Sequence, residues 1–197
     1  YSSFKIRSEL FILLNTEFPN GDIIGIQKSF LLQTLQTAKS DPTIKNIFIF
    51  SHKLVWAAGR PDFGAVIANV NAKKHYHLSK FASQILPSLQ KVAKVKPIYW
   101  GSGDIGNPPS FGLFFHFDQR DNITYFATGL GDVPEDSVVH VMVTKNGNIK
   151  FEAISLTSQT PVDIAFYGLD FWHKKYAFFS LLKWKVRRIL AHPYFSY

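Results

Sequence analysis

Short apolar runs alternate with amphipathic helical stretches in the first half of this chain, and this alternation limits its possible folds more than any other feature. Three apolar runs without helical period predict buried strands, at Glu9 to Asn15, Lys45 to Ser51 and Lys96 to Trp100. Between them, apolar residues recur at helical spacing over residues 23–38 and 78–92. This order of strand, helix, strand, helix, strand predicts an α/β sheet with parallel neighbouring strands.

The two helical stretches carry finer expectations. Pro87 is expected to kink the second stretch or to mark a second helix start. Asn20 or Asp22 is expected to cap the first stretch. Its apolar residues share one face, which we expect to pack on the sheet: Ile23, Ile26, Phe30, Leu31, Leu35 and Ala38.

After residue 110 the pattern changes to short strand-like segments, at residues 111–117, 123–128, 138–144 and 149–156. Asn146-Gly147, between the last two, indicates a type I′ hairpin. We therefore expect a mixed α/β fold, in which a sheet with flanking helices continues into antiparallel strands over residues 1–160. Residues 161–197 are expected to form a basic, aromatic helical extension.

Composition limits the chemistry and the partners. The 197 residues include no cysteine, which excludes disulfides and thiolate metal sites and leaves His, Asp, Glu or Asn as metal ligands. The 22 Lys and Arg outnumber the 14 Asp and Glu, and the net charge of +8 attracts phosphates, nucleic acid or an acidic membrane. No apolar run approaches the roughly 18 to 20 residues of a spanning helix. We expect a cytoplasmic or membrane-peripheral protein, and the initial Tyr1 suggests a processed or incomplete chain.

Gly101, Gly103 and Gly106 match the G-x-G-x-x-G pattern of dinucleotide-binding loops. That mechanism requires a helix directly after the loop, so that its N-terminus faces the pyrophosphate. Here Asn107-Pro108-Pro109 and a strand-like run follow, so we reject the dinucleotide interpretation.

His52 and Asp104 each follow a predicted buried strand. Because ligands gather at the carboxyl ends of parallel strands, both side chains are expected at one edge of the sheet. An imidazole and a carboxylate are plausible ligands for one divalent metal ion. The alternative is that Asp104 caps a turn and His52 is a hydrogen-bonded loop residue.

The chain resembles the second half of the calcineurin-like metallophosphoesterases. The carrying segments are YSSF, ELFILLNTE, IQKSFLLQTL, NIFIFSHKLVW, PIYWGSGDIGN, ITYFATGLGD and VVHVMVTKNGNIKFEAI. His52 matches a metal-binding histidine at the end of a strand, and PIYWGSGDIGN lies where the family has Gly-His-x-His. The resemblance implies a phosphoester substrate and divalent Mn, Fe, Zn or Mg, with His52 and Asp104 as metal ligands.

The sequence departs from this family at its metal motifs. Asp-x-His, Gly-Asp-x-x-Asp and Gly-Asn-His-Asp/Glu are absent, and Asp104 and Gly106 replace the two histidines of Gly-His-x-His. A two-metal site needs about six ligands or more. Two hypotheses follow. The first is a metal-dependent phosphoester hydrolase, or the C-terminal portion of one, if those motifs lie upstream. The second is a non-catalytic module that binds a protein partner or a membrane.

The last part of the sequence combines an apolar helical stripe with cations and amphipathic rings. The stripe comprises Phe179, Leu182, Val186, Ile189 and Leu190, and the rings include Trp172 and Trp184. Its cations are expected to contact anionic lipid: Lys174, Lys175, Lys183, Lys185, Arg187 and Arg188. The alternative is a helix packed on the sheet with a solvated basic face. No specific nucleic acid is predicted, and the oligomeric state is left open.

Overall fold

The computed structural model of the chain describes residues 1–17, 22–67, 79–105, 114–118, 121–129, 136–157 and 161–174. Its centre is a six-stranded mixed sheet in the order β1-β2-β3-β4-β6-β5, here called the main sheet. The strands are β1 (Ser2–Ile6), β2 (Glu9–Leu13), β3 (Asn46–Ser51), β4 (Ile98–Ser102), β5 (Phe114–Asp118) and β6 (Ile123–Thr128). The inner strands β2, β3, β4 and β6 run parallel, and each outer strand is antiparallel to its neighbour.

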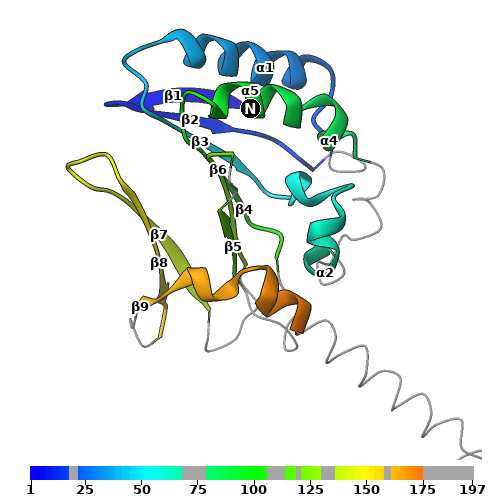
Figure 1. The fold of residues 1–197 in the computed structure, drawn as a ribbon, viewed down its shortest axis with the longest axis vertical. Helices are drawn as coiled ribbons and strands as arrows, with labels where there is room; N and C mark the ends of the chain where they lie inside the picture. The colour runs from blue at the N-terminus through cyan, green and yellow to red at the C-terminus, as the bar shows by residue number, and fades with distance from the viewer. Residues whose placement is uncertain are drawn as a thin grey trace, which may run out of the picture.

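Helices cover one face of the main sheet (Figure 1). They are α1 (Gly25–Ser40), α4 (Phe81–Gln84) and α5 (Leu86–Ala93), and α2 (Gly64–Ile67) follows the loop after β3. The face beneath them is apolar because alternate strand residues point toward it, including Ile12, Ile49 and Trp100, which are fully buried. This layer of sheet and helices is the α/β architecture that the sequence pattern predicts.

A small antiparallel sheet lies on the opposite face of the main sheet (Figure 1). It comprises β7 (Ser137–Val143), β8 (Ile149–Ser155) and β9 (Pro161–Val162), in that order. Phe151 of β8 joins the two sheets, since its ring centroid lies 5.8 Å from that of Tyr99 and 5.0 Å from that of Phe126. The continuation into antiparallel strands is therefore confirmed.

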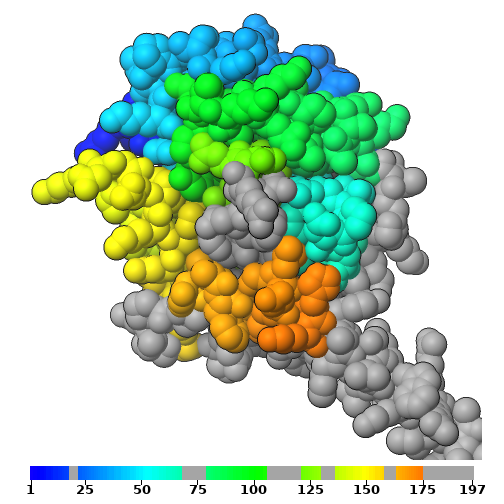
Figure 2. Space-filling model, viewed as in Figure 1, coloured from blue at the N-terminus to red at the C-terminus, as the bar shows by residue number. Residues whose placement is uncertain are grey.

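The first part of the C-terminal stretch packs on the rest of the domain. After the short helix η4 (Ile164–Tyr167), a further helix covers residues 169–174, drawn in orange beside the cyan loop after β3 in Figure 2. Trp172, which the sequence suggested as a membrane-interface ring, is instead fully buried in the main core. Among the described residues, no helix combines the length and the apolar character needed to cross a membrane.

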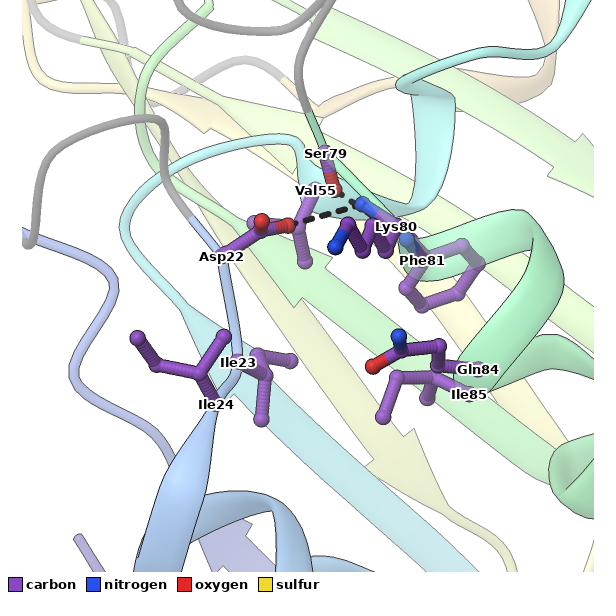
Figure 3. Close-up of a pocket in the computed structure, with 9 residues that line it drawn as sticks. All are labelled: Asp22, Ile23, Ile24, Val55, Ser79, Lys80, Phe81, Gln84 and Ile85. Carbon is purple, nitrogen blue, oxygen red and sulfur yellow. Dashed lines mark hydrogen bonds between the residues drawn. The ribbon is translucent and has the colours of Figure 1, made fainter.

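The start of α1 differs from the sequence-based expectation. Its N-cap is Ile24, which makes no side-chain cap, and Ile26 is 78% exposed, while Gln27 takes a buried position. Asp22 does not cap α1, because its carboxylate accepts a hydrogen bond from the Lys80 main-chain nitrogen at 2.9 Å, beside a cavity of about 10 Å³ (Figure 3). Asp22 thus connects the segment before α1 to the start of α4 through this hydrogen bond.

The prediction for the second helical stretch is confirmed, and the turn type predicted for the last hairpin is wrong. Pro87 lies in the first turn of α5 and marks a second helix start, as expected. The β7–β8 hairpin exists, but its turn is not type I′, because Gly147 has a positive φ of 81° and Asn146 does not. The Gly147 amide donates to the Thr144 carbonyl, which makes a longer turn.

Candidate functional site

His52 and Asp104 lie at adjacent strand ends on one edge of the main sheet. Ser51, the last residue of β3, pairs with Ser102, the last of β4. The main-chain carbonyl of His52 then accepts hydrogen bonds from the amides of Gly103 at 2.9 Å and Asp104 at 2.8 Å. The prediction that the two residues follow neighbouring strands at the same edge is confirmed, and we call this region the carboxyl edge.

The carboxyl edge contains a second acid that the sequence analysis missed. Glu17 Oε1 lies 3.9 Å from His52 Nε2, and the two side chains are 60% and 57% exposed. The Lys53 amide donates to Thr16 Oγ1 at 2.9 Å and so joins the segment after β2 to the loop after β3. Glu17 lies farther beyond its strand than His52 or Asp104 does, so its position in the sequence was only a weak signal.

A buried glutamine anchors the segment that carries Glu17. The Gln27 side-chain amide donates to the Asn15 carbonyl at 2.7 Å, and its carbonyl oxygen accepts from the Asn15 amide at 2.9 Å. This paired contact satisfies main-chain groups beyond the end of β2 in a region with no further strand partner among the described residues. The polar residue on the buried side of α1 therefore positions the carboxyl edge.

Glycines allow the loops of the carboxyl edge to approach one another. A Cβ on Gly103 would lie 3.4 Å from His52 Nδ1, and one on Gly129 would lie 2.0 Å from the Ile105 carbonyl oxygen. A Cβ on Gly101 would meet the Phe126 ring at 2.6 Å. Of the G-x-G-x-x-G pattern, Gly101 thus serves packing, whereas a Cβ on Gly103 would make only an ordinary contact, and Gly106 lies outside the described residues.

Beneath the carboxyl edge, two serines and two tryptophans form a buried hydrogen-bond network. Trp56 Nε1 donates to Ser102 Oγ and Trp100 Nε1 to Ser51 Oγ, each at 2.9 Å, and the two hydroxyl oxygens are 3.1 Å apart. Ser51 Oγ donates to the Lys53 carbonyl at 2.9 Å. The network fixes the loop that begins with His52 to the ends of β3 and β4.

The same loop covers Tyr125, whose hydroxyl is buried. The Tyr125 ring stacks on Trp56 at 5.0 Å, and the Arg60 guanidinium lies 5.3 Å from the Tyr125 ring centroid. Burial raises the pKa of Tyr125 to about 12, and the nearby Arg60 charge opposes that rise only in part. A neutral phenol is therefore part of the packing that holds the loop.

The raised pKa of Tyr125 predicts an alkaline weakening of the fold. The unfolded chain releases the phenol proton near pH 10, whereas the folded chain keeps it to about pH 12. The contribution of Tyr125 to the free energy of unfolding is therefore complete below pH 10 and is lost as the pH rises toward 12. Over that range, the free energy of unfolding of wild type should fall by about 2 to 3 kcal/mol more than that of Tyr125→Phe. Urea unfolding at a series of pH values measures the difference, and parallel curves would contradict it.

The predicted lipid-contacting cations fall mostly outside the described residues. Lys174 is exposed near the end of the described helix. Lys175, Lys183, Lys185, Arg187 and Arg188 lie beyond the part of the chain that the structure describes. Their contact with lipid stays a prediction.

The donor set at the carboxyl edge is one imidazole and two carboxylates, which suit a divalent ion. Within the described ranges, no group of three or more His, Asp or Glu side chains is arranged to hold a metal ion. The residues therefore fit part of a coordination sphere and not a complete two-metal centre. No protein-family model, no curated protein and no solved structure matches this chain.

Proposed function

We propose that the carboxyl edge is the metal-binding edge of a metal-dependent phosphoester hydrolase, with His52 and Asp104 as ligands. The observation that carries the proposal is the pair of hydrogen bonds from the Gly103 and Asp104 amides to the His52 carbonyl, at 2.9 and 2.8 Å. These main-chain bonds hold the loops that carry His52 and Asp104 side by side, at the edge where ligands of parallel sheets bind.

Glu17 supports His52 in this role. Its carboxylate is 3.9 Å from His52 Nε2, which is beyond hydrogen-bond distance, so its part in the proposal is a nearby negative charge that favours a bound cation. A bound divalent ion supplies Lewis-acid polarisation of a phosphoryl oxygen. Because a two-metal centre needs about six ligands, we assign the described residues metal binding and no complete hydrolytic step.

Metal binding tests the proposal directly. Titration of Mn²⁺ into the ¹⁵N-labelled chain should broaden the amide signals of His52, Gly103 and Asp104 first. His52→Ala and Asp104→Asn should each weaken binding by about tenfold, because each removes one of few ligands. His140→Ala, at an exposed histidine of β7, is the matched control. Equal affinity in all variants, or no selective broadening, would contradict the assignment.

We expect this 197-residue chain by itself to have no appreciable turnover of phosphomonoester or phosphodiester substrates with Mn²⁺, Mg²⁺ or Zn²⁺. The physical reason is the ligand count, since His52, Asp104 and Glu17 together do not hold two ions. Release of nitrophenol from its phosphate mono- and diesters is the measurement. Robust turnover that disappears in His52→Ala would mean that further ligands join this edge.

The second candidate is a non-catalytic module that binds a protein partner or a membrane surface. It is favoured by the small ligand set of the described residues and by the net charge of +8. Each cation near an acidic bilayer contributes about 1 kcal/mol. Lys183, Lys185, Arg187 and Arg188 would therefore make lipid binding strong enough to detect.

Liposome co-sedimentation tests the membrane form of this candidate. Binding should rise with anionic lipid, fall with salt, and be lost on truncation after Lys174, which keeps the buried Trp172. Replacing the four cations by glutamate should also abolish it. A variant with four exposed lysines outside the tail replaced by glutamate, at Lys39, Lys45, Lys91 and Lys94, undergoes the same change of charge and controls for net charge. Equal loss in both variants would argue against a specific tail contact.

A further inference from the structure

The first strand is an exposed edge of the main sheet. β1 is outermost in the strand order, beside β2 (Figure 1). All five of its residues are exposed. Phe4 is 45% exposed and Ile6 is 54% exposed. An edge strand with apolar side chains is a template for pairing with another strand. Which strand can pair with β1 depends on which of its main-chain groups point outward and on which side chains would meet.

The hairpin register identifies the outward-pointing groups of β1. Ile6 pairs with Glu9 across the two-residue turn Arg7-Ser8, and Arg7 has a φ of 55°. In a two-residue hairpin, the pair that flanks the turn is hydrogen-bonded, and such pairs alternate along the strands. Ile6, Phe4 and Ser2 therefore bond to β2, while the amide and carbonyl groups of Lys5 and Ser3 point away from the sheet.

An aromatic row crosses the main sheet and ends at β1. Phe4 stacks on Phe11 at 5.2 Å, Phe11 on Phe48 at 5.3 Å, and Phe48 on Tyr99 at 5.0 Å, with interplanar angles of 11°, 15° and 21°. The row lies on the face opposite the helices. Phe151 of the small sheet covers its Tyr99 end, whereas Phe4 at the other end is exposed.

We propose that β1 pairs antiparallel with β1 of a second copy of this chain, about a two-fold axis at Phe4. In this register Ser3 faces Lys5 of the second copy, so the outward-pointing groups form the hydrogen-bonded pairs. The two Phe4 residues form the closer, non-hydrogen-bonded pair, and the aromatic row continues across the axis. Lys5 faces serine and not a second lysine, so no like charges oppose each other.

The pairing is weak. A single five-residue strand pair buries far less than the roughly 800 Å² per partner of a stable interface, so we expect a dimer that forms only at high protein concentration. Two copies of charge +8 also repel each other, so added salt should strengthen the dimer. Both properties distinguish this contact from an obligate dimer.

Sedimentation velocity over a concentration and salt series measures the association. Ser3→Pro removes an outward amide without touching the bonds from β1 to β2, so it should weaken association at least tenfold while leaving thermal unfolding unchanged. Phe4→Lys should act similarly by placing two cations together. Ile26→Lys, at an exposed apolar position of α1, is the control and should leave association unchanged.

Cysteine pairing tests the register, because the chain contains no cysteine. Ser2 of one copy faces Ile6 of the other, so a mixture of Ser2→Cys and Ile6→Cys chains should form mixed disulfide dimers under mild oxidation. Either variant alone should form few, since like positions lie about four residues apart along the strand. A chain that stays monomeric at millimolar concentration, or equal cross-linking in mixed and single samples, would overturn the proposal.

Discussion

Gly129→Ala is expected to destabilise the fold by about 3 kcal/mol or more. The added Cβ would lie 2.0 Å from the Ile105 carbonyl oxygen and 3.1 Å from its carbonyl carbon. Both are main-chain atoms, so no flexible side chain can move aside, and the loops after β4 and β6 must separate. Urea unfolding measures the loss of stability.

Gly64→Ala is the matched control for this substitution. Gly64 has helical dihedral angles, and an added Cβ would meet nothing within 4 Å. Alanine there should be neutral or slightly stabilising, because it restricts the unfolded chain. Ile105 follows Asp104, so Gly129→Ala should also weaken Mn²⁺ binding, whereas Gly64→Ala should not. Wild-type stability in Gly129→Ala would mean that the two loops are not in this close contact.

Trp56→Ala should cost about 3 to 5 kcal/mol, the range for a fully buried large side chain. Trp56 stacks on Tyr125 at 5.0 Å and contacts the Phe63 ring edge-on at 5.4 Å. Its loss therefore removes the apolar contact that holds the loop after β3 against the sheet. Thermal and urea unfolding measure the effect, and His52 should become more mobile in NMR relaxation.

Smaller substitutions separate the packing of Trp56 from its hydrogen bond. Ser102→Ala leaves the Trp56 indole N–H without its acceptor and should cost about 1 to 3 kcal/mol. Trp56→Phe removes that donor but keeps a ring, so it should cost less than Trp56→Ala. In a double-mutant cycle, Ser102→Ala should cost less in the Trp56→Phe background. Strict additivity would show that the indole and the hydroxyl contribute independently.

The local sequence pattern was sufficient to predict most strands of the main sheet. Unbroken apolar runs predicted β2, β3 and β4 within two residues at every end, because strands buried on both faces tolerate few polar residues. Pro87 marked the break between α4 and α5 because a proline lacks the amide that a helix interior needs. The adjacency of His52 and Asp104 followed from strand order, since consecutive parallel strands present their carboxyl ends to the same edge.

Other features of the fold could not be predicted from the local sequence. β1 escaped prediction because its five residues are exposed and its pairing with β2 depends on the Arg7-Ser8 turn. Ile26 matched the apolar stripe of α1, yet the helix orients Gln27 inward, because Gln27 satisfies the main chain of Asn15 twelve residues earlier in sequence. A hydropathy pattern carries no information on such a partner.

Periodicity and chain order were enough to predict the alternation of strands and helices and the edge at which His52 and Asp104 lie. Three further contacts depend on how distant segments pack: Glu17 lies near His52, Trp172 is buried in the core, and Gly129 faces the Ile105 carbonyl. These contacts join segments far apart in the sequence. Their residues are fixed by the space that the packed strands and loops leave between them, which no local pattern encodes.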